Sequence, residues 1–116
     1  MRDLLRATRA LSDESRLRML KLLLDKEICI CEMREIFPKS ESQISRHLKI
    51  LMDAGFLKRW TDGRCVVYAA DRETKNNHCR ALMEFLGNSL NDDKWLQEDR
   101  KKLQKVVEDQ VREKCK

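Results

Sequence analysis

The chain has 116 residues, of which 41% are hydrophobic and 39% are charged, with five cysteines and a net charge of +5 at pH 7. This length favours one domain with a modest core, and a chain so highly charged is expected to need a partner subunit to complete that core. No apolar run approaches the roughly 20 residues that span a bilayer, and the arginine-rich start lacks the apolar stretch of a signal peptide. An odd number of cysteines without other marks of secretion predicts a cytoplasmic protein with reduced thiols.

Basic charge and helix-forming composition mark the rest of the sequence. A pI near 9.1 fits contact with a polyanion such as nucleic acid, although solvated lysines and glutamates produce the same value. Only one proline and three glycines interrupt a chain rich in Leu, Lys, Arg and Glu. Such a composition predicts a mainly α-helical protein.

Leucines at helical spacing predict two helices at the start of the chain. Leu4, Leu5 and Leu11 place the first helix near residues 3–11. Ser12 is expected to cap the next helix, because the acidic residues that follow it suit the positive end of a helix dipole. The inward side of this second helix is predicted to carry Leu17, Leu20, Leu23 and Leu24.

Two further helices are predicted between Cys31 and Gly55. A short helix should run from about Cys31 to Phe37, because Pro38 marks its end. Ser40 is a suitable N-cap for a fourth helix, and Gly55 suits the left-handed position that closes it. The apolar face of the fourth helix is predicted to consist of Ile44, Leu48, Ile50 and Leu51.

A β-hairpin is predicted after the fourth helix. Residues 56–61 and 64–68 are β-prone, and the Asp62-Gly63 pair between them is a strong turn signal. We predict no other strand. After Asp71 the pattern returns to helix, with one apolar stripe formed by Leu82, Met83, Leu86 and Leu90.

A last helix is predicted near the C-terminus, capped from within residues 91–93. Its apolar residues either pack on the domain's own core or form a dimer surface. The small core and the length of this helix favour the dimer surface. The apolar residues concerned are Trp95, Leu96, Leu103, Val106, Val107 and Val111.

The order helix, short turn, helix and hairpin predicts a winged helix-turn-helix, mainly α with a β-hairpin wing. In this arrangement one helix reads base edges in the major groove, while basic groups near the helix ends and the hairpin hold phosphates. Residues 39–68 contain six Lys or Arg against three Asp or Glu, so the basic excess is concentrated there. We assign residues 1–90 to the DNA-binding domain with its dimerisation helices, and residues 91–116 to a C-terminal helix for dimerisation or packing.

Three segments resemble a known family. Residues 40–51 (SESQISRHLKIL) look like the recognition helix of ArsR/SmtB metal-responsive repressors, and residues 53–57 (DAGFL) like the segment after it. Residues 11–18 (LSDESRLR) resemble the start of the family's second helix, with Glu14 where proline is common. The resemblance covers about residues 3–70, and the recognition segment is its most specific part.

The resemblance implies a homodimer, built from the first and the late helices, that binds a palindromic DNA operator until an inducer releases it. It implies no cofactor for DNA binding. Arg64 at the hairpin tip is expected near the minor groove or a phosphate. His47 has an alternative role, in which it supports the pair of helices instead of touching a base. The residues implied to face DNA from the recognition segment are Ser40, Ser42, Gln43, Ser45, Arg46, His47 and Lys49.

Cys29 and Cys31 carry the most informative chemistry of the chain. Two thiols two residues apart are able to chelate one soft ion, because thiolates select soft metals and metalloids. In a regular helix these positions point about 200° apart, so binding requires an extended segment or a distorted start of the third helix. The surrounding residues resemble the arsenic-sensing site of the family, which implies As(III) or Sb(III) as inducer. The plain alternative is that both are small buried hydrophobic side chains.

The complete set of ligands stays open at this point. The arsenic-type motif often has a third cysteine where this chain has Arg34. A third ligand is available from Cys65, Cys79 or Cys115, in the same subunit or the other, or from a small thiol or water. Because the third helix is expected to pack behind the recognition helix, its distortion would convert ligand binding into loss of DNA affinity.

Other functions compete with metalloid sensing. Cadmium and lead also take thiolates, and neighbouring thiols serve as oxidation sensors. A zinc site of the family's type is not expected, because His78 is the only histidine after His47. The sequence shows no Gly-rich loop and no obvious Cys-His pair, which disfavours a cysteine enzyme. An interaction module without DNA would leave Gln43, Ser45 and Arg46 without a role.

Overall fold

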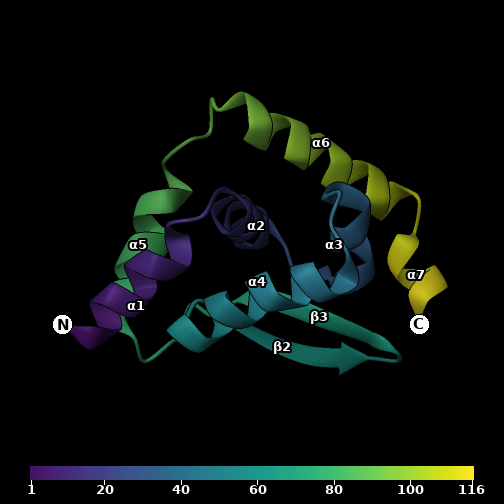
Figure 1. The fold of residues 1–116 in the computed structure, drawn as a ribbon. Helices are drawn as coiled ribbons and strands as arrows, with labels where there is room; N and C mark the ends of the chain where they lie inside the picture. The colour runs from purple at the N-terminus through teal and green to yellow at the C-terminus, as the bar shows by residue number, and fades with distance from the viewer.

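A computed structural model describes all residues from 1 to 116 and shows a mainly helical chain with a small antiparallel sheet. Figure 1 shows α2 at the centre, α1 and α5 together at one end, α6 along the top, and α4 beside the β2–β3 hairpin. The predicted fold class, a winged helix-turn-helix, is confirmed. The helices are α1 Arg2–Leu11, α2 Glu14–Asp25, α3 Ile30–Ile36, α4 Glu41–Ala54, α5 Asn77–Gly87, α6 Lys94–Glu108 and α7 Val111–Cys115, and the strands are β1 Ile28–Cys29, β2 Leu57–Asp62 and β3 Cys65–Ala70.

The junction between α1 and α2 corrects the predicted cap. Asp13, not Ser12, is the N-cap of α2: its backbone is extended and its Oδ1 accepts the Arg16 backbone N–H at 3.0 Å. Ser12 instead closes α1, and its Oγ donates to the Thr8 carbonyl at 2.7 Å. A carboxylate one residue further on reaches the free N–H groups of α2, so the serine stays with the preceding helix.

Both ends of α4 agree with their prediction. Ser40 is the N-cap, with its Oγ accepting the Gln43 N–H at 3.2 Å and its own N–H donating to Gln43 Oε1 at 2.9 Å. Gly55 closes the helix at φ +110°, where a Cβ would lie 3.0 Å from Thr74 Oγ1. A side chain at this position would meet both backbone strain and a collision. Ile50 was predicted on the apolar face but is 37% exposed, because only Ile44, Leu48 and Leu51 of that set point inward.

The sheet contains one strand more than predicted. Its order is β1-β3-β2, with all pairs antiparallel, and β1 comprises only Ile28 and Cys29. A run of two residues gives no periodic signal, so the sequence alone did not reveal it. In the hairpin, Asp62 pairs with Cys65, and the turn is Gly63–Arg64 instead of the predicted Asp62–Gly63. Gly63 has φ +64°, which fits a turn that needs glycine at its first central position.

The C-terminal third differs from its prediction in two ways. α5 ends at Gly87, and Leu90 lies beyond it with φ +63° and 43% exposure, so it does not continue the apolar stripe. The last predicted helix is interrupted at Gln110, where φ is +56°, and the remaining residues form the separate helix α7. The N-cap of α6 is Asp93, inside the predicted capping segment.

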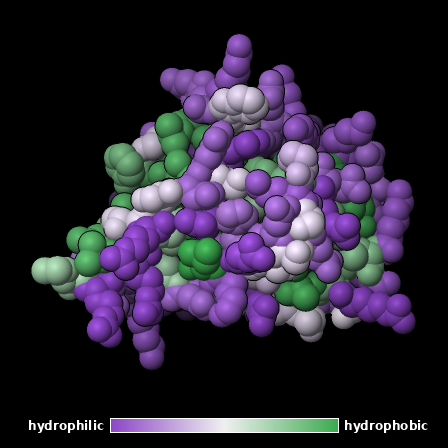
Figure 2. All heavy atoms as spheres, viewed as in Figure 1, coloured by the Kyte–Doolittle hydropathy of each residue, from purple (hydrophilic) through white to green (hydrophobic).

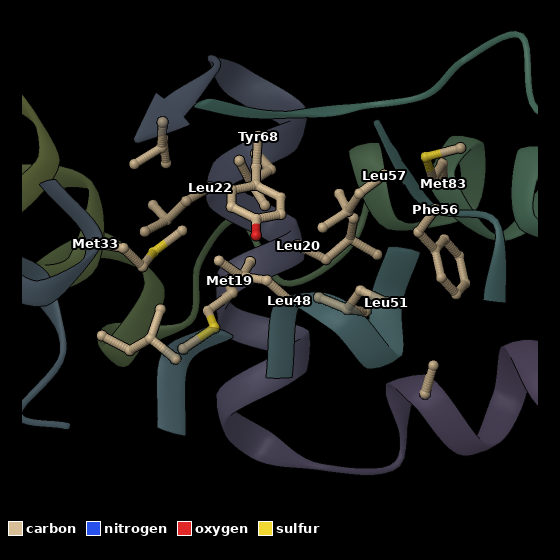
Figure 3. Close-up of a cluster of buried hydrophobic side chains, with 14 of the residues drawn as sticks. Met19, Leu20, Leu22, Met33, Leu48, Leu51, Phe56, Leu57, Tyr68 and Met83 are labelled. Carbon is tan, nitrogen blue, oxygen red and sulfur yellow. The ribbon is translucent and has the colours of Figure 1, made fainter. Parts of the chain in front are cut away.

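One hydrophobic core joins nearly all helices. The labelled side chains of Figure 3 come from α2, α3, α4, α5 and the hairpin and meet around Tyr68. α6 packs on α2 and α3 and contributes Leu103 and Val106 to the same core, as the packing alternative for this helix required. The other residues of its predicted apolar side differ in burial. Leu96 is buried and Trp95 and Val107 are exposed, while Val111 belongs to the separate helix α7.

The surface is mostly hydrophilic, with one notable apolar region. Figure 2 shows hydrophobic atoms gathered at one end of the molecule, over α1 and α5. No helix combines the length and the apolar character that crossing a membrane would demand. The large hydrophobic residues exposed at this end are Met1, Leu4 and Leu5 of the α1 segment and Phe85 of α5.

Candidate functional site: a DNA-facing helix and a thiol cluster

The exposed side of α4 presents most of the predicted DNA-contacting residues. Ser42, Gln43, Arg46 and Lys49 are exposed, Ser45 is half-buried, and the exposed Ser40 caps the helix. Ser40 Oγ and Ser42 Oγ lie 3.2 Å apart, and the capping box holds Gln43 against Ser40. The first turn of α4 is therefore a fixed set of hydrogen-bonding groups that faces solvent, as a helix that reads base edges requires.

Three basic side chains of the predicted set differ in their surroundings. Lys49 Nζ lies 3.0 Å from Asp53 Oδ2, so an exposed carboxylate partly neutralises it. Arg64 is exposed in the two-residue turn of the hairpin, the position expected for a phosphate or minor-groove contact. Arg46 is exposed and makes no ion pair within 4 Å, which leaves its guanidinium free for a base or a phosphate.

His47 lies on the inner flank of α4. Its Nδ1 is 3.3 Å from Arg16 Nη1, and the same arginine donates to the Ala10 and Arg9 carbonyl oxygens. Burial lowers the pKa of His47, so the ring favours the neutral form that accepts from Arg16. This geometry matches the alternative role in which His47 supports the packing of α4 on α2, and its contact with DNA stays a prediction.

A basic groove between α1 and α4 was missed at the sequence level. It has a volume of about 900 Å³ and brings arginines of α1 and α2 next to Ile50 and Asp53 of α4. The signal was present in the spacing of the α1 arginines, which recur on one side of a helix. The groove extends the basic surface beside the DNA-facing helix. Its arginines are Arg2, Arg6, Arg9 and Arg16.

The thiol cluster begins with the pairing of β1 and β3. Cys29 lies opposite Val67, and Cys65 is two residues before Val67 on the same strand. Because side chains on one face of a sheet recur every second residue, Cys29 and Cys65 share a face and meet diagonally. The register of a two-residue strand therefore places two thiols, 36 residues apart in the chain, in one buried cluster.

Cys31 completes a group of three thiols. Cys29 is in extended backbone at the N-cap of α3, and Cys31 lies on the first helical turn. This break between strand and helix brings the two Sγ atoms to 2.8 Å, and Cys31 Sγ is 4.0 Å from Cys65 Sγ. The three sulfur atoms all lie within 4.8 Å of one another. The segment is thus extended at Cys29, which is the geometry that a shared ligand needs.

The remaining cysteines have different surroundings. Cys79 is buried on α5, donates to the Ala54 carbonyl at 3.2 Å and takes no part in the cluster. Cys115 of α7 is partly buried and packs against the cluster. Of the three cysteines considered as a third ligand, the fold brings Cys65 into the group, places Cys115 beside it and separates Cys79 from it.

A buried ion pair supports the cluster from one side. Glu32 is 3% exposed; its Oε1 accepts the Cys29 N–H at 2.9 Å and the Arg112 Nη2–H at 2.9 Å. Arg112 also donates to Glu27 Oε1 at 3.0 Å. Burial lowers the pKa of Arg112, but its bonds to Glu32 and Glu27 outweigh that effect and raise it. One carboxylate thus fixes both the backbone of Cys29 and the helix α7.

Two thiols of the cluster have raised pKa values. Burial, together with the neighbouring thiols of Cys115 and Cys29, raises the pKa of Cys31 well above its usual range. Burial is also the main cause that raises the pKa of Cys65 to about 11. A thiophilic ion must displace the protons of these thiols to bind, since the thiolate is the metal ligand.

The fold and these two sites define the class: a winged helix-turn-helix DNA-binding regulator with an internal thiol cluster. Residues 13–59 match the family model described as bacterial regulatory protein, arsR family. In these residues the chain is similar to the arsR family of bacterial regulatory proteins.

Curated relatives carry names of metal and metalloid resistance. The chain is 32% identical over 83 residues to a cadmium resistance transcriptional regulatory protein CadC homolog of Staphylococcus aureus, an alignment that covers 71% of this chain and 65% of the relative. It is 36% identical over 69 residues to an arsenical resistance operon repressor of Bacillus subtilis (strain 168), covering 59% and 66%. The chain thus spans just under two thirds of the length of these relatives.

Solved structures of similar proteins agree with the fold. HlyU from Vibrio cholerae N16961 superposes with a TM-score of 0.62 at 26% identity, over 72% of this chain and 87% of that one. A structure described as a possible transcriptional regulator for arsenical resistance gives 0.54 at 28% identity, over 87% and 92%. The matched family model is described as a regulatory protein, and solved structures of similar fold are described as transcriptional regulators.

Proposed function

We propose that this chain is a homodimeric repressor that binds operator DNA through α4 and the hairpin. Support comes from the exposed first turn of α4, the basic groove beside it and the names of the regulatory relatives. The apolar end over α1 and α5 is the proposed dimer surface, since a second copy would cover its exposed side chains. The repressor works in the cytoplasm and needs no cofactor to bind DNA.

We further propose that a thiophilic metalloid, arsenite or antimonite, releases the repressor from DNA. The observation that carries this proposal is the group of three sulfur atoms within 4.8 Å, formed by Cys29, Cys31 and Cys65. As(III) forms three bonds, so it matches three cysteines: each As–S bond replaces an As–O bond of arsenite, and each thiol proton leaves with the displaced hydroxyl group as water. The relatives named for cadmium resistance make the choice of ion the point to be tested.

The position of the cluster explains how a bound ion would change the affinity for DNA. Cys65 directly follows Arg64 of the hairpin turn, while Cys31 lies on α3, which packs against α4. An ion about 2.3 Å from each sulfur holds neighbouring sulfurs about 3.5–3.8 Å apart. Cys29 Sγ and Cys31 Sγ, which are 2.8 Å apart, must therefore separate, and the junction between β1 and α3 is displaced relative to the wing. A movement at this place changes the distance between the wing and the DNA-facing helix, and simultaneous contact with DNA is lost.

The test measures how the protein releases a fluorescently labelled DNA duplex. The sequence of this duplex is taken from the promoter region of the chain's own gene. Fluorescence anisotropy is followed while arsenite, antimonite, cadmium, lead and zinc are titrated under reducing conditions. We expect arsenite or antimonite to release DNA from the wild-type chain. The double variant Cys29→Ser, Cys31→Ser should bind DNA, and neither ion should release it. The matched control is Cys79→Ser, which removes a buried thiol outside the cluster and should respond like wild type.

Two results would contradict the proposal. A double variant still released by arsenite would locate the sensor elsewhere in the chain. DNA binding that none of the ions disturbs, together with release by peroxide, would favour the oxidation alternative.

A further inference from the structure

The C-terminal helix α7 is folded back onto the thiol cluster. At Gln110 the backbone adopts φ +56°, a left-handed conformation that turns the chain sharply after α6. α7 then packs on α3, and Cys115 at its end lies against the group of three thiols. Figure 1 shows the C-terminus ending beside the tip of the β2–β3 hairpin.

Three separate contacts hold α7 in this place. The Arg112 guanidinium binds the buried Glu32 and also Glu27, as described above. The Cys65 thiol donates to the Arg112 carbonyl oxygen at 3.6 Å, and Lys116 Nζ lies 3.1 Å from Asp62 Oδ2 at the hairpin. Helix α7 is therefore attached to the strand–helix junction and to the wing, the two parts that the thiol cluster joins.

A surface groove between α3 and α7 gives an ion access to the thiol of Cys31. This groove has a volume of about 450 Å³ and is lined by Cys31, Arg34 and Val111, among others. Cys31 and Cys115 are both partly exposed, whereas Cys29 and Cys65 are buried. An ion entering through this groove would meet Cys31 first, and Cys115, which is partly exposed beside the cluster, does not line the groove.

From this placement we propose that Cys115 is a fourth ligand, which makes the cluster a four-thiolate site for a soft divalent cation such as cadmium. The proposal rests on the proposed function, since it extends the same site. Four thiolates suit an ion that prefers tetrahedral geometry, whereas As(III) is saturated by three. Each of the four thiols releases one proton to solvent as it binds, and no change of oxidation state occurs. The availability of Cys115 as a ligand therefore distinguishes a four-coordinate cation such as cadmium from As(III), which needs only three thiolates.

The test compares cadmium and arsenite binding to the full chain, wild type and Cys115→Ser. Cadmium binding is followed by the ultraviolet thiolate-to-metal charge-transfer band and by competition with a chelator. We expect Cys115→Ser to weaken cadmium on the order of tenfold or more, and to reduce the band from the intensity of four thiolates to that of three. Arsenite affinity should stay at the wild-type value. Cys79→Ser should leave both ions unaffected.

A second pair of variants tests the attachment of α7. Arg112→Ala removes the contacts to Glu32 and Glu27, and Arg100→Ala removes a comparable pair with Asp25 away from the cluster. We expect the first variant to weaken cadmium binding more than arsenite binding, because Arg112 fixes α7 directly and Cys29 only through Glu32, and the second to change neither. Melting curves recorded in parallel identify a variant that fails to fold, and Arg112→Lys then replaces it.

The proposal is overturned if Cys115→Ser binds cadmium with wild-type affinity and spectrum, or if it weakens cadmium and arsenite equally. Its failure is separable from that of the proposed function, which is read from DNA release alone. A chain that binds cadmium through Cys115 but never releases DNA would support the four-thiolate site and refute the repressor mechanism.

Discussion

The DNA-facing surface and the thiol cluster are assembled in different ways. The first is mainly one continuous helix, α4, whose cap, exposed side and terminating glycine all lie within sixteen consecutive residues from Ser40 to Gly55. The second brings together β1, the first turn of α3, the start of β3 and the end of α7. The DNA-facing surface is thus a local structure, whereas the cluster exists only when the whole domain is folded.

This difference has a functional consequence. A surface carried by one helix keeps its shape while that helix moves as a body. A group of thiols drawn from separate segments reports on the relative positions of those segments, and in the proposed mechanism an ion bound there alters them. The two regions should therefore be separable by mutation, with variants that lose one property and keep the other.

The largest effect is expected from Cys65→Ser. This change removes the only cluster thiol on the wing, so arsenite should no longer release DNA although the affinity for DNA stays unchanged. Anisotropy titration of the DNA complex with arsenite measures both quantities. Cys79→Ser serves as control because it removes a buried thiol that lies outside the cluster. Normal release by the Cys65 variant would mean that the wing takes no part in sensing.

The next largest effect is expected from a change that disrupts the proposed dimer. The affinity for DNA should depend on the dimer, whereas ion binding to the thiol cluster should not. Phe85→Arg places a charge on the apolar end of the molecule, where Phe85 is 66% exposed. We expect a monomer by sedimentation equilibrium, a strong loss of operator affinity and unchanged ion binding. Val107→Arg on α6 is the matched control. If the Val107 variant dissociates and the Phe85 variant does not, the dimer surface lies on α6.

Arg46→Ala should weaken DNA binding and leave ion binding intact, which is the reverse of the result expected for Cys65→Ser. Loss of a guanidinium that contacts a base or phosphate costs about 1–3 kcal/mol, or roughly 5- to 150-fold in Kd. Ion binding should be unaffected, since Arg46 is exposed on α4 and takes no part in the cluster. Affinity is compared at one fixed salt concentration, because salt strongly affects DNA binding. Lys101→Ala, an exposed change on α6, should leave the Kd unaltered.

The same comparison explains what the sequence was able to predict. The limits of α4, its Ser40 cap and its Gly55 terminus follow from local signals that no tertiary contact overrides. The membership of Cys65 in the cluster depends on the register of a two-residue strand, and the position of Cys115 beside the cluster depends on a sharp turn at Gln110. Neither feature leaves a periodic pattern, so the sequence offered three further cysteines without a means to choose among them.

The smallest effect tests a local signal that was assigned one residue too early. Asp13→Ala removes the acceptor for the Arg16 N–H and should lower the free energy of unfolding by about 1 kcal/mol. Ser12→Ala is the matched control, and a surface change of this kind should stay within about 0.5 kcal/mol. Urea unfolding at one protein concentration measures both values. A larger loss for the serine variant would restore Ser12 as the cap of α2.

The pH dependence of the Asp13 effect sharpens this result. The Arg16 backbone N–H is the main cause that lowers the pKa of Asp13 below its ordinary value. A carboxylate with a lowered pKa stabilises the folded state above its unfolded pKa, about 3.9, and loses that effect as the pH falls through the folded value. The difference between wild type and Asp13→Ala should therefore be constant from pH 7 to about pH 5 and shrink below about pH 4. A difference that persists unchanged at low pH would show that Asp13 acts through packing and not through its charge.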